Sequence, residues 1–295
     1  MTAQPNRALR VFLAGLGFSV LWPSASTASK IALANSQPFI LSVVRFFIGG
    51  ILMLGISHLV MRKRLPAGKE WKQLAIYGLL NISLYLGIYI VAMQYVSAGL
   101  GSLAIAINPV LITIISGIIL KKPVGKPVFI SLFICLTGVF IAALPLFEGA
   151  HATPGGIFLL FVSMVIYSLG VIYYSERSWN GLHILTINGW QTLMGGLFLL
   201  PFAIITYKPG ANHYNHDFWF SVLWLAVAVS IAAVQLWLYL LRDNPVKASF
   251  WLFFCPIAGF LIAWALVGEP ITLFTITGMA LVILGLYLVQ RRKTP

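Results

Sequence analysis

Residues 108–123 read NPVLITIISGIILKKP, and residues 255–270 read CPIAGFLIAWALVGEP. Each stretch contains a proline, thirteen mostly apolar residues and a second proline, and the two copies lie 147 positions apart. The first copy ends on two lysines, whereas the second ends on Gly-Glu before its last proline. The pattern indicates a chain built from two copies of one unit, each long enough to hold several such segments.

The composition places the chain in a membrane. Of its 295 residues 60% are hydrophobic and 8% are charged, against roughly 25% charged residues in soluble domains. The formal net charge of +13 would suggest nucleic acid as the partner of a soluble chain, but these basic residues lie between apolar runs and act as topology signals. Cys135 and Cys255 both lie inside apolar runs. We therefore expect no disulfide framework, metal site or cofactor.

Ten apolar stretches are long enough to cross a bilayer, whose core of about 30 Å needs about 20 helical residues. They are residues 9–29, 39–60, 73–93, 99–120, 127–146, 155–174, 182–205, 218–241, 247–267 and 271–289. The expected fold class is an all-α integral membrane protein with ten transmembrane helices. The longest connection, Tyr207–Asp217, contains two histidines. A solvated loop is favoured there over a metal site, because the spacing matches no ligand motif.

The basic residues predict the orientation of these helices. If the helices alternate in direction, 16 Lys and Arg residues fall on the side of the N-terminus and only Lys208 falls on the other. By the positive-inside rule both termini are then cytoplasmic, and we expect a multi-pass protein of the cell inner (plasma) membrane. One alternative concerns the start of the chain. Arg7, Arg10, a short apolar stretch and the small residues SASTAS (24–29) also resemble a signal peptide cleaved after Ala28.

The repeat extends beyond the two quoted stretches. At the offset of 147 Ser102 matches Ser249, Pro109 matches Pro256, Pro123 matches Pro270 and Gly138 matches Gly285, while Gly49-Gly50 matches Gly195-Gly196 at 146 and Trp22 matches Tyr167 at 145. We interpret residues 1–150 and 151–295 as two five-helix repeats. Because five is odd, the second enters the membrane from the opposite side, which is the inverted repeat of many secondary transporters. The Lys-Lys ending then lies in the cytoplasm and the Gly-Glu ending lies outside.

Pro109 and Pro256 are predicted to lie in the middle of their helices, at matched positions. Each removes one backbone hydrogen bond and leaves a carbonyl without its usual partner. A membrane tolerates this where polar groups or cavity water replace the bond. We therefore interpret both prolines as structural or gating elements close to a substrate site at the membrane midplane. A static kink for packing is the alternative.

Two cations lie within or at the edge of the predicted spans, whereas all six carboxylates lie in loops or at helix ends. Arg45 lies about two turns into the second helix, where a charge is costly unless it is paired or hydrated. We predict that it contacts an anionic group of the substrate or closes an outer gate with Glu269. Lys30 ends the first helix, and its side chain is expected to extend to the headgroups. The same snorkelling is the alternative for Arg45.

Polar and aromatic residues inside the spans are the candidates for substrate binding. They are Trp22, Asn81, Tyr85, Asn108, Tyr167, Gln235 and Trp251. Asn81 and Tyr85 share one helix face at a spacing of four, and together the set would line a central cavity for a small amphipathic metabolite. The alternative for each residue is structural, since amides also join helices in membranes and Trp and Tyr also mark membrane interfaces.

Several short motifs, in this order, make the chain resemble the ten-helix EamA-type branch of the drug/metabolite transporter superfamily. They are Trp22 and Lys30 in LWPSASTASK (21–30), Arg45, AMQYVSAGLGSL (92–103) leading into Asn108-Pro109, Pro256, Gly268-Glu269-Pro270 and Gly285. The resemblance implies a cavity bounded by helices 1, 3, 4, 6, 8 and 9, and export or occasionally uptake of amino acids, other metabolites or drugs. Two positions depart from the family. Pro23 stands where Gly is common, and Lys122 stands where Glu is frequent.

These features predict a permease or exporter that moves small amphipathic metabolites, such as amino acids or drug-like solutes, by alternating access. Proton coupling and facilitated exchange are both left open. Sugar-phosphate or nucleotide-sugar exchange is an alternative, but it would favour several buried cations, and only Arg45 is clearly within a span. A non-transporting membrane receptor or assembly factor is the alternative of another class. An enzyme is not expected, because no catalytic motif occurs in the spans. The expected partners are a small-molecule substrate and the lipid bilayer, not nucleic acid.

Overall fold

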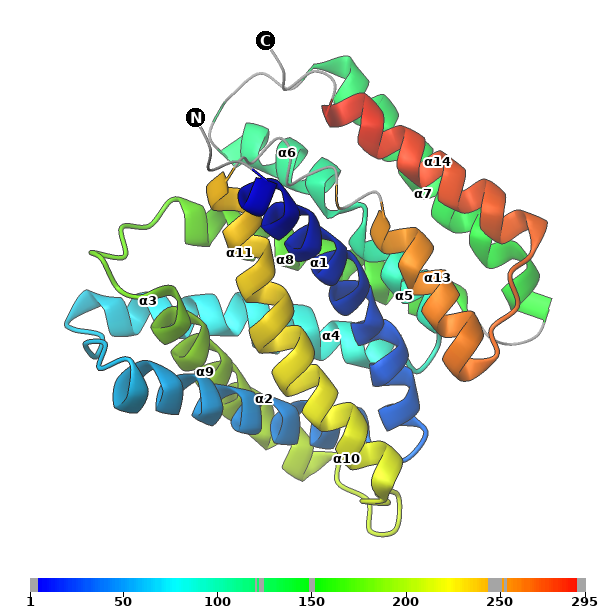
Figure 1. Ribbon diagram of the computed structural model, residues 1–295. Coiled ribbons are helices and arrows are strands. Elements are labelled where there is room, and N and C mark those ends of the chain that lie inside the picture. Colours follow the sequence, from blue (N-terminus) through cyan, green and yellow to red (C-terminus); the bar gives the residue numbers. More distant parts are fainter. Residues whose placement is uncertain are drawn as a thin grey trace. The chain divides into compact units, whose positions relative to one another are not determined.

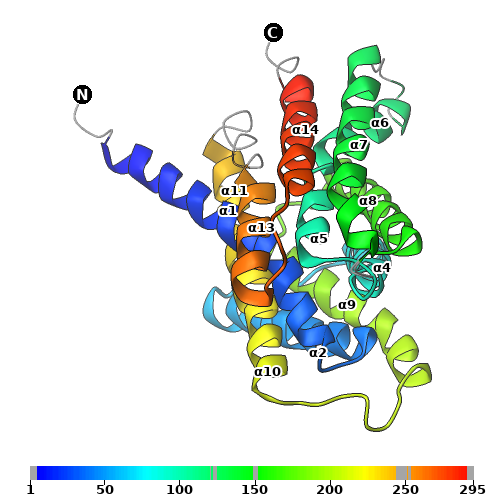
Figure 2. The same cartoon turned by 90° about the vertical axis from the view of Figure 1, so that its right-hand side faces the viewer.

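A computed structural model describes residues 5–119, 121, 125–148, 152–243, 251 and 254–290, and it consists of helices joined by short connections (Figures 1 and 2). In chain order the elements are α1 (Pro5–Leu33), α2 (Pro38–Leu54), η1 (Gly55–Val60), α3 (Lys69–Gly78), η2 (Leu79–Leu84), α4 (Tyr85–Ala92), α5 (Ala98–Ile105), α6 (Asn108–Ile119), α7 (Lys126–Glu148), α8 (Pro154–Ser175), α9 (Ile184–Ile205), α10 (His216–Leu223), η3 (Trp224–Ala233), α11 (Val234–Asp243), α13 (Phe254–Val267) and α14 (Leu273–Gln290). Lys122, Pro123, Lys247, Ser249 and the basic residues 291–293 lie outside the described residues.

Helix is present in each of the ten predicted stretches. Within the described residues seven helical segments are long and apolar enough to cross a membrane, and the bent pair α5–α6 makes an eighth if it is counted as one crossing. The remaining two, α13 and α14, are apolar but shorter. The all-α membrane fold is therefore confirmed, while full crossings by α13 and α14 stay a prediction.

The fourth predicted helix is broken. α5 ends at Ile105, α6 begins at Asn108, and the two axes differ by 40°. Pro109 is the second residue of α6, in a first turn where its missing N–H removes no helical bond. The prediction that Pro109 lies inside a continuous helix was therefore wrong, because one helix ends before the proline and another begins beside it. Pro256 is the third residue of α13 as described, and its place in the middle of a helix stays a prediction, because residues 252 and 253 lie outside the described residues.

The chain divides into two compact units, each taking segments from both sequence repeats. The first unit comprises residues 1–28, 96–153 and 228–295, and the second comprises residues 29–95 and 154–227. Two helices belong to both, since the division falls within α1 and within η3. The boundary between sequence repeats at residue 150 stays a prediction, and each compact unit combines parts from both sides of it.

In the first unit α7 and α14 lie side by side (Figures 1 and 2). Glycines allow their backbones to approach, since a Cβ on Gly138 would lie 2.7 Å from the carbonyl oxygen of Gly278, and one on Gly285 would lie 2.9 Å from that of Ser131. The later the residue in α7, the earlier its neighbour in α14, so the helices are antiparallel. The offset of 147 exchanges the two contacts, because it relates Gly138 to Gly285 and Ser131 to Gly278.

In the second unit α2 and α9 form a similar antiparallel pair. A Cβ on Gly50 would lie 3.1 Å from the Cβ of Leu193, and one on Gly196 would lie 3.3 Å from the ring of Phe47. These contacts are exchanged by the offset of 146 that relates the Gly-Gly pairs of the two helices. Near the end of the same contact surface the hydroxyls of Ser57 and Thr186 share a hydrogen bond of 2.6 Å.

The third predicted helix (α3, η2 and α4) and the eighth (α10, η3 and α11) each contain a π-helical segment. Residues 79–84 form η2, and moving them by 147 positions gives 226–231, which lie inside η3. Such segments are rare and frequently occur at functional sites. In η2 the Ser83 hydroxyl donates to the carbonyl of Gly195 in α9 over 2.9 Å. The two repeats therefore share a local irregularity as well as their helices.

Candidate functional site

The predicted site residues are divided between the two units. The second unit contains Lys30, Arg45, Asn81, Tyr85 and Tyr167. The first contains Trp22, Asn108, Pro109, Gln235, Trp251, Pro256 and Glu269. Each unit therefore has polar and aromatic candidates of its own.

Three amide side chains form a chain of hydrogen bonds inside the second unit. Asn81 in η2 donates through Nδ2 to Oε1 of Gln191 over 3.2 Å, and Gln191 donates through Nε2 to Oδ1 of Asn188 over 2.9 Å. Gln191 is buried and shares a face of α9 with Asn188, three residues before it. Only Asn81 was predicted. The signal for the other two is a pair of amides three positions apart in the otherwise apolar stretch 184–205.

Tyr85 and Tyr167 meet in the same unit. Tyr85, the first residue of α4, is buried, and its ring centroid lies 4.8 Å from that of Tyr167 in α8. α8 also approaches η2, because a Cβ on Gly170 would lie 3.6 Å from the Cβ of Asn81. Three of the predicted residues, Asn81, Tyr85 and Tyr167, are therefore brought together by η2, α4 and α8.

Arg45 is buried within the second unit, in α2. Only 8% of the surface of Arg45 is exposed, and its guanidinium carbon lies 5.1 Å from the centroid of the Phe46 ring. Tyr85 and Tyr89 are the ionisable groups that interact with its charge. A cation within a span needs polar or aromatic partners, and the Phe46 ring and the two tyrosines supply them. Arg45 is the charged member of this cluster.

Lys30 in α1 is anchored to the protein backbone. Its Nζ donates to the carbonyl of Met93 over 3.0 Å. Met93 directly follows α4, and carbonyls at the C-terminal end of a helix carry partial negative charge that favours a cation. The contact therefore fastens the end of α1 to the end of α4 within the second unit.

Trp22 and Trp251 belong to an aromatic cluster of the first unit. Besides them the cluster includes Phe18, Trp237 and Cys255. Phe18 stacks on Trp237 with ring centroids 4.7 Å apart. Trp251 fits against α1 because residue 15 is glycine, where a Cβ would overlap the indole ring. The Ser19 hydroxyl donates to the Trp251 carbonyl over 3.0 Å.

Three further predicted residues of the first unit have different surroundings. Asn108 is 5% exposed, and its Oδ1 has no hydrogen-bond partner among the described residues. Gln235 is half-buried in α11, directly before Leu236 and Trp237 of the aromatic cluster. The Glu269 carboxylate accepts hydrogen bonds from the N–H groups that begin α5, including that of Gly99 at 2.8 Å. Because Arg45 lies in the other unit, its pairing with Glu269 stays a prediction.

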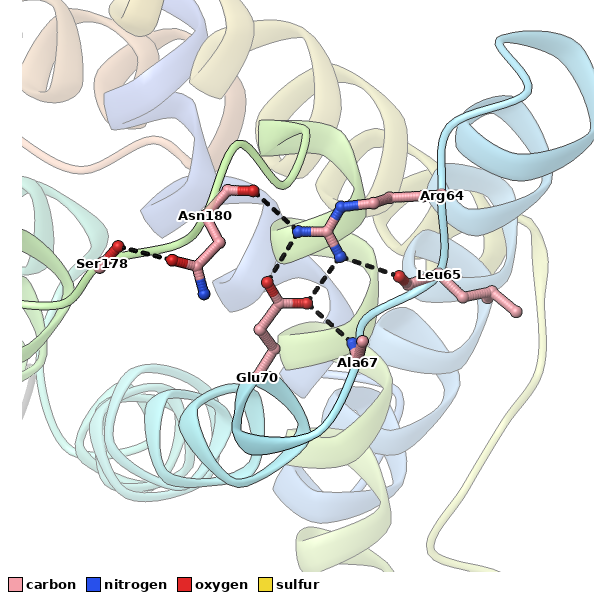
Figure 3. Close-up of polar contacts among 6 residues, drawn as sticks. All are labelled: Arg64, Leu65, Ala67, Glu70, Ser178 and Asn180. Atoms are coloured by element: carbon pink, nitrogen blue, oxygen red, sulfur yellow. Dashed lines mark hydrogen bonds and ion pairs between the residues drawn. The ribbon is translucent and has the colours of Figure 1, made fainter.

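Arg64 and Glu70 form an ion pair that the sequence did not reveal (Figure 3). Two parallel hydrogen bonds of 2.7 Å join them, which is the strong bidentate arrangement. Arg64 also donates to the carbonyl of Asn180 over 2.9 Å, so the pair joins the connection before α3 to the connection between α8 and α9. The hydrogen bonds to Glu70 raise the pKa of Arg64 above its usual value. Both connections lie on the predicted cytoplasmic side.

On the predicted outer side Gln37 joins two other connections of the second unit. Its N–H donates to Oδ1 of Asn212 over 2.8 Å, and its Oε1 accepts from Nδ2 of Asn212 and from the N–H of Lys208. Nearby, Asn215 donates through Nδ2 to Oδ1 of Asn35 over 2.7 Å. The stretch 207–217, predicted as a solvated loop, is therefore fastened to the connection between α1 and α2.

The second unit also contains an apolar hollow of about 320 Å³. It is lined by Phe39, Leu79, Ser83, Leu84, Gly87, Ile88, Val91, Leu159, Phe198, Leu199 and Phe202. Its one hydroxyl, Ser83, is already bonded to Gly195. None of the predicted substrate-binding residues lines it, and it offers no polar group to orient a solute. It is a different feature from the predicted cavity.

Comparison with known proteins gives consistent matches over nearly the whole chain. The model of the EamA-like transporter family matches twice, over residues 9–144 and 154–291. An uncharacterized transporter of Archaeoglobus fulgidus is 25% identical over 92% of this chain and 95% of its own length, and the uncharacterized transporter YvbV of Bacillus subtilis is 26% identical over 93% and 89%. The crystal structure of another protein has a similar fold, with a TM-score of 0.65 at 17% identity, and the match covers 97% of this chain and 99% of that one.

Proposed function

Because the chain belongs to the EamA-like transporter family, we propose that it moves small amphipathic metabolites, such as amino acids or drug-like solutes, across the inner membrane by alternating access. The relatives are named as transporters without a stated substrate. The substrate class therefore rests on the side chains of this chain, whereas membership of the family supports transport over catalysis.

The hydrogen-bonded amides Asn81, Gln191 and Asn188 carry the proposal of substrate class. They lie in helices of the second unit together with Tyr85 and Tyr167, so hydrogen-bonding groups and aromatic rings occur side by side within the spans. Binding sites for small organic molecules combine mostly apolar walls with a few placed polar groups. This surrounding suits a solute with a planar or apolar body and several hydrogen-bonding groups.

We further propose that the two repeats have opposite orientations and that both termini are cytoplasmic. The contacts between α7 and α14 and those between α2 and α9, each exchanged by the repeat offset, support a twofold relation between the halves. The side of the N-terminus has 16 basic residues and the other side has one, which supports a cytoplasmic location of both termini. Two such halves can exchange conformations, so that a site opens to one side and then to the other.

A flux measurement with purified protein in proteoliposomes tests the proposal. The solute panel contains the standard amino acids, aromatic amines, hydrophobic cations, hexose phosphates and nucleotide sugars. We expect flux of at least one amino acid or drug-like solute above that of empty vesicles. Replacement of Gln191 by Leu should lower this flux, whereas Lys72→Ala, on an exposed position of α3, should leave it unchanged. No flux for any solute would refute the transport proposal.

The same panel decides between the proposal and its alternatives. Flux confined to hexose phosphates or nucleotide sugars would establish the exchanger alternative, although Arg45 is the only buried cation among the described span residues. A receptor or assembly factor needs no path for solutes. In that case cysteines placed at Asn108 and Gln235 would resist water-soluble thiol reagents from both sides. Reaction at these positions is expected of a transporter.

A further inference from the structure

Several backbone donors at the break between α5 and α6 are already in use. Four N–H groups around it donate to carbonyls of the same segment over 3.0–3.2 Å. They are Ala106 to Leu103, Ile107 to Ala104, and both Val110 and Leu111 to Ile107. Buried backbone groups are nearly always paired, so these four N–H groups are not available to a ligand.

One side-chain acceptor at the break is not served by these donors. Oδ1 of Asn108 is buried, with 5% of the residue exposed, and has no partner among the described residues. The carbonyl of Pro109 is satisfied by the Thr113 hydroxyl at 2.7 Å. An unpaired buried oxygen is costly, so the site favours a ligand that brings donors.

The equivalent place in the second repeat is closed within the protein. Cys255 corresponds to Asn108 at the offset of 147, and its thiol donates to the carbonyl of Trp251 over 3.7 Å. The same carbonyl accepts the Ser19 hydroxyl at 3.0 Å. Asn108 in the first repeat therefore has an unpaired acceptor, whereas the equivalent Cys255 in the second repeat is hydrogen-bonded within the protein.

We propose that the break between α5 and α6 binds the protonated primary amino group of the transported solute, with Oδ1 of Asn108 as an acceptor. The proposal rests on the transport function proposed above and narrows its substrate class to primary amines and amino acids. An ammonium group brings three donors and no acceptor, so it can donate to this unpaired oxygen. An ionised carboxylate or phosphate has no donor to give to this oxygen.

Binding to neutral oxygens also suits transport. Exposed backbone carbonyls at broken helices can coordinate cations in transporters, and a site must release its ligand as well as bind it. With no carboxylate in this position, Asn108 would hold an ammonium group by hydrogen bonds without a full opposite charge. Replacement by Asp is therefore expected to bind the amine at least as tightly, and replacement by Leu is expected to lose it.

Thermal unfolding of the full-length protein in detergent tests the assignment. The probes are the standard amino acids, 2-phenylethylamine, and the 2-hydroxy acid that corresponds to each amino acid. We expect at least one amino-bearing probe to raise Tm for the native protein and for Asn108→Asp, with an apparent Kd at least about tenfold weaker in Asn108→Leu. The matched hydroxy acid should raise Tm in none of them. Cys255→Ser, at the equivalent position, should behave as the native protein.

Several results would overturn the assignment. They are equal stabilisation by an amino acid and its hydroxy acid, undiminished binding to Asn108→Leu, loss of binding in Asn108→Asp, or no stabilisation by any amino-bearing probe. Stabilisation by NaCl over choline chloride, lost in Asn108→Leu, would make the break an ion site and would also overturn it. Failure of the assignment is separable from failure of the transport function, because flux of solutes without an amino group would leave transport intact.

Discussion

The thiol of Cys135 in α7 donates to the carbonyl of Val282 in α14 over 3.7 Å, and these two residues are 147 positions apart. This separation is the offset that relates the two repeats, so the two contacting residues are equivalents of one another. Residues exchanged by a twofold rotation can touch only close to its axis. The contact therefore places a local twofold axis of the first unit at the crossing of α7 and α14. The glycine contacts on both sides of it are exchanged as such an axis requires.

Gly138→Leu should destabilise the protein at this crossing. A side chain there would meet the backbone of Gly278, and overpacking of a close contact costs about 1–3 kcal/mol, a fall in Tm of about 2–10 °C for a chain of this size. Gly155→Leu is the matched control, because no atom lies within 4 Å of its added Cβ. Equal Tm values for the two variants would show that the helices do not meet at Gly138.

Gln191→Leu should destabilise the second unit by leaving two amides unpaired. Loss of one partner from a buried hydrogen bond costs about 1–3 kcal/mol, and Gln191 is bonded to both Asn81 and Asn188. Asn81→Leu combined with Gln191→Leu should cost less than the sum of the single changes, because residues of one network couple by about 0.5–3 kcal/mol. Strict additivity in denaturation of the four proteins would show that the two amides do not interact.

Arg64→Ala should loosen the connections on the predicted cytoplasmic side. The change removes the two bonds to Glu70 and the bond to Asn180, so the amides of 61–68 and 176–183 should exchange hydrogen faster. Lys72→Ala provides the control in the same region, since Lys72 is exposed on α3. Hydrogen exchange followed by mass spectrometry measures both segments. Unchanged exchange in Arg64→Ala would mean that the ion pair does not hold the two connections together.

Reporter tags at the two ends should show the same orientation. A tag that is active only in the cytoplasm should be active at both the N- and the C-terminus, and should be silent in the connection 207–217. The reason is the excess of basic residues on one side combined with the predicted even number of crossings. Activity at one terminus alone would contradict the pairing of two oppositely oriented halves.

Much of the fold could be predicted because its causes are local to each segment. The length of apolar runs predicts spans, and positive charge predicts direction. The close pairs at Gly138 and Gly50 were visible as repeated glycines, although their partners were not. The break before Pro109 was missed because a proline in an apolar run fits both a kink and a new helix start. Only the backbone of the whole segment distinguishes the two.

The candidate site was predicted in part for a different reason. Asn81, Tyr85 and Tyr167 meet in one unit, whereas their role in substrate binding stays a prediction. Gln191 was not singled out, because no property of the stretch 184–205 shows which helix its amide will face. Arg64 and Glu70 were interpreted by charge alone, and their pairing depends on how two connections distant in sequence come together. Contacts between segments are therefore the part that the residues of one segment cannot specify.

The two π-helical segments, η2 and η3, bear on the history of the chain. A π-helical turn contains one residue more than the α-helical turn it replaces, as if one residue had been inserted. Since the segments are equivalent, a single insertion in a five-helix ancestor accounts for both, whereas separate origins would need two events in matching places. With the two repeats oppositely oriented as proposed, such an ancestor would have inserted into the membrane in both directions, and two opposed chains would have done the work of the present single chain.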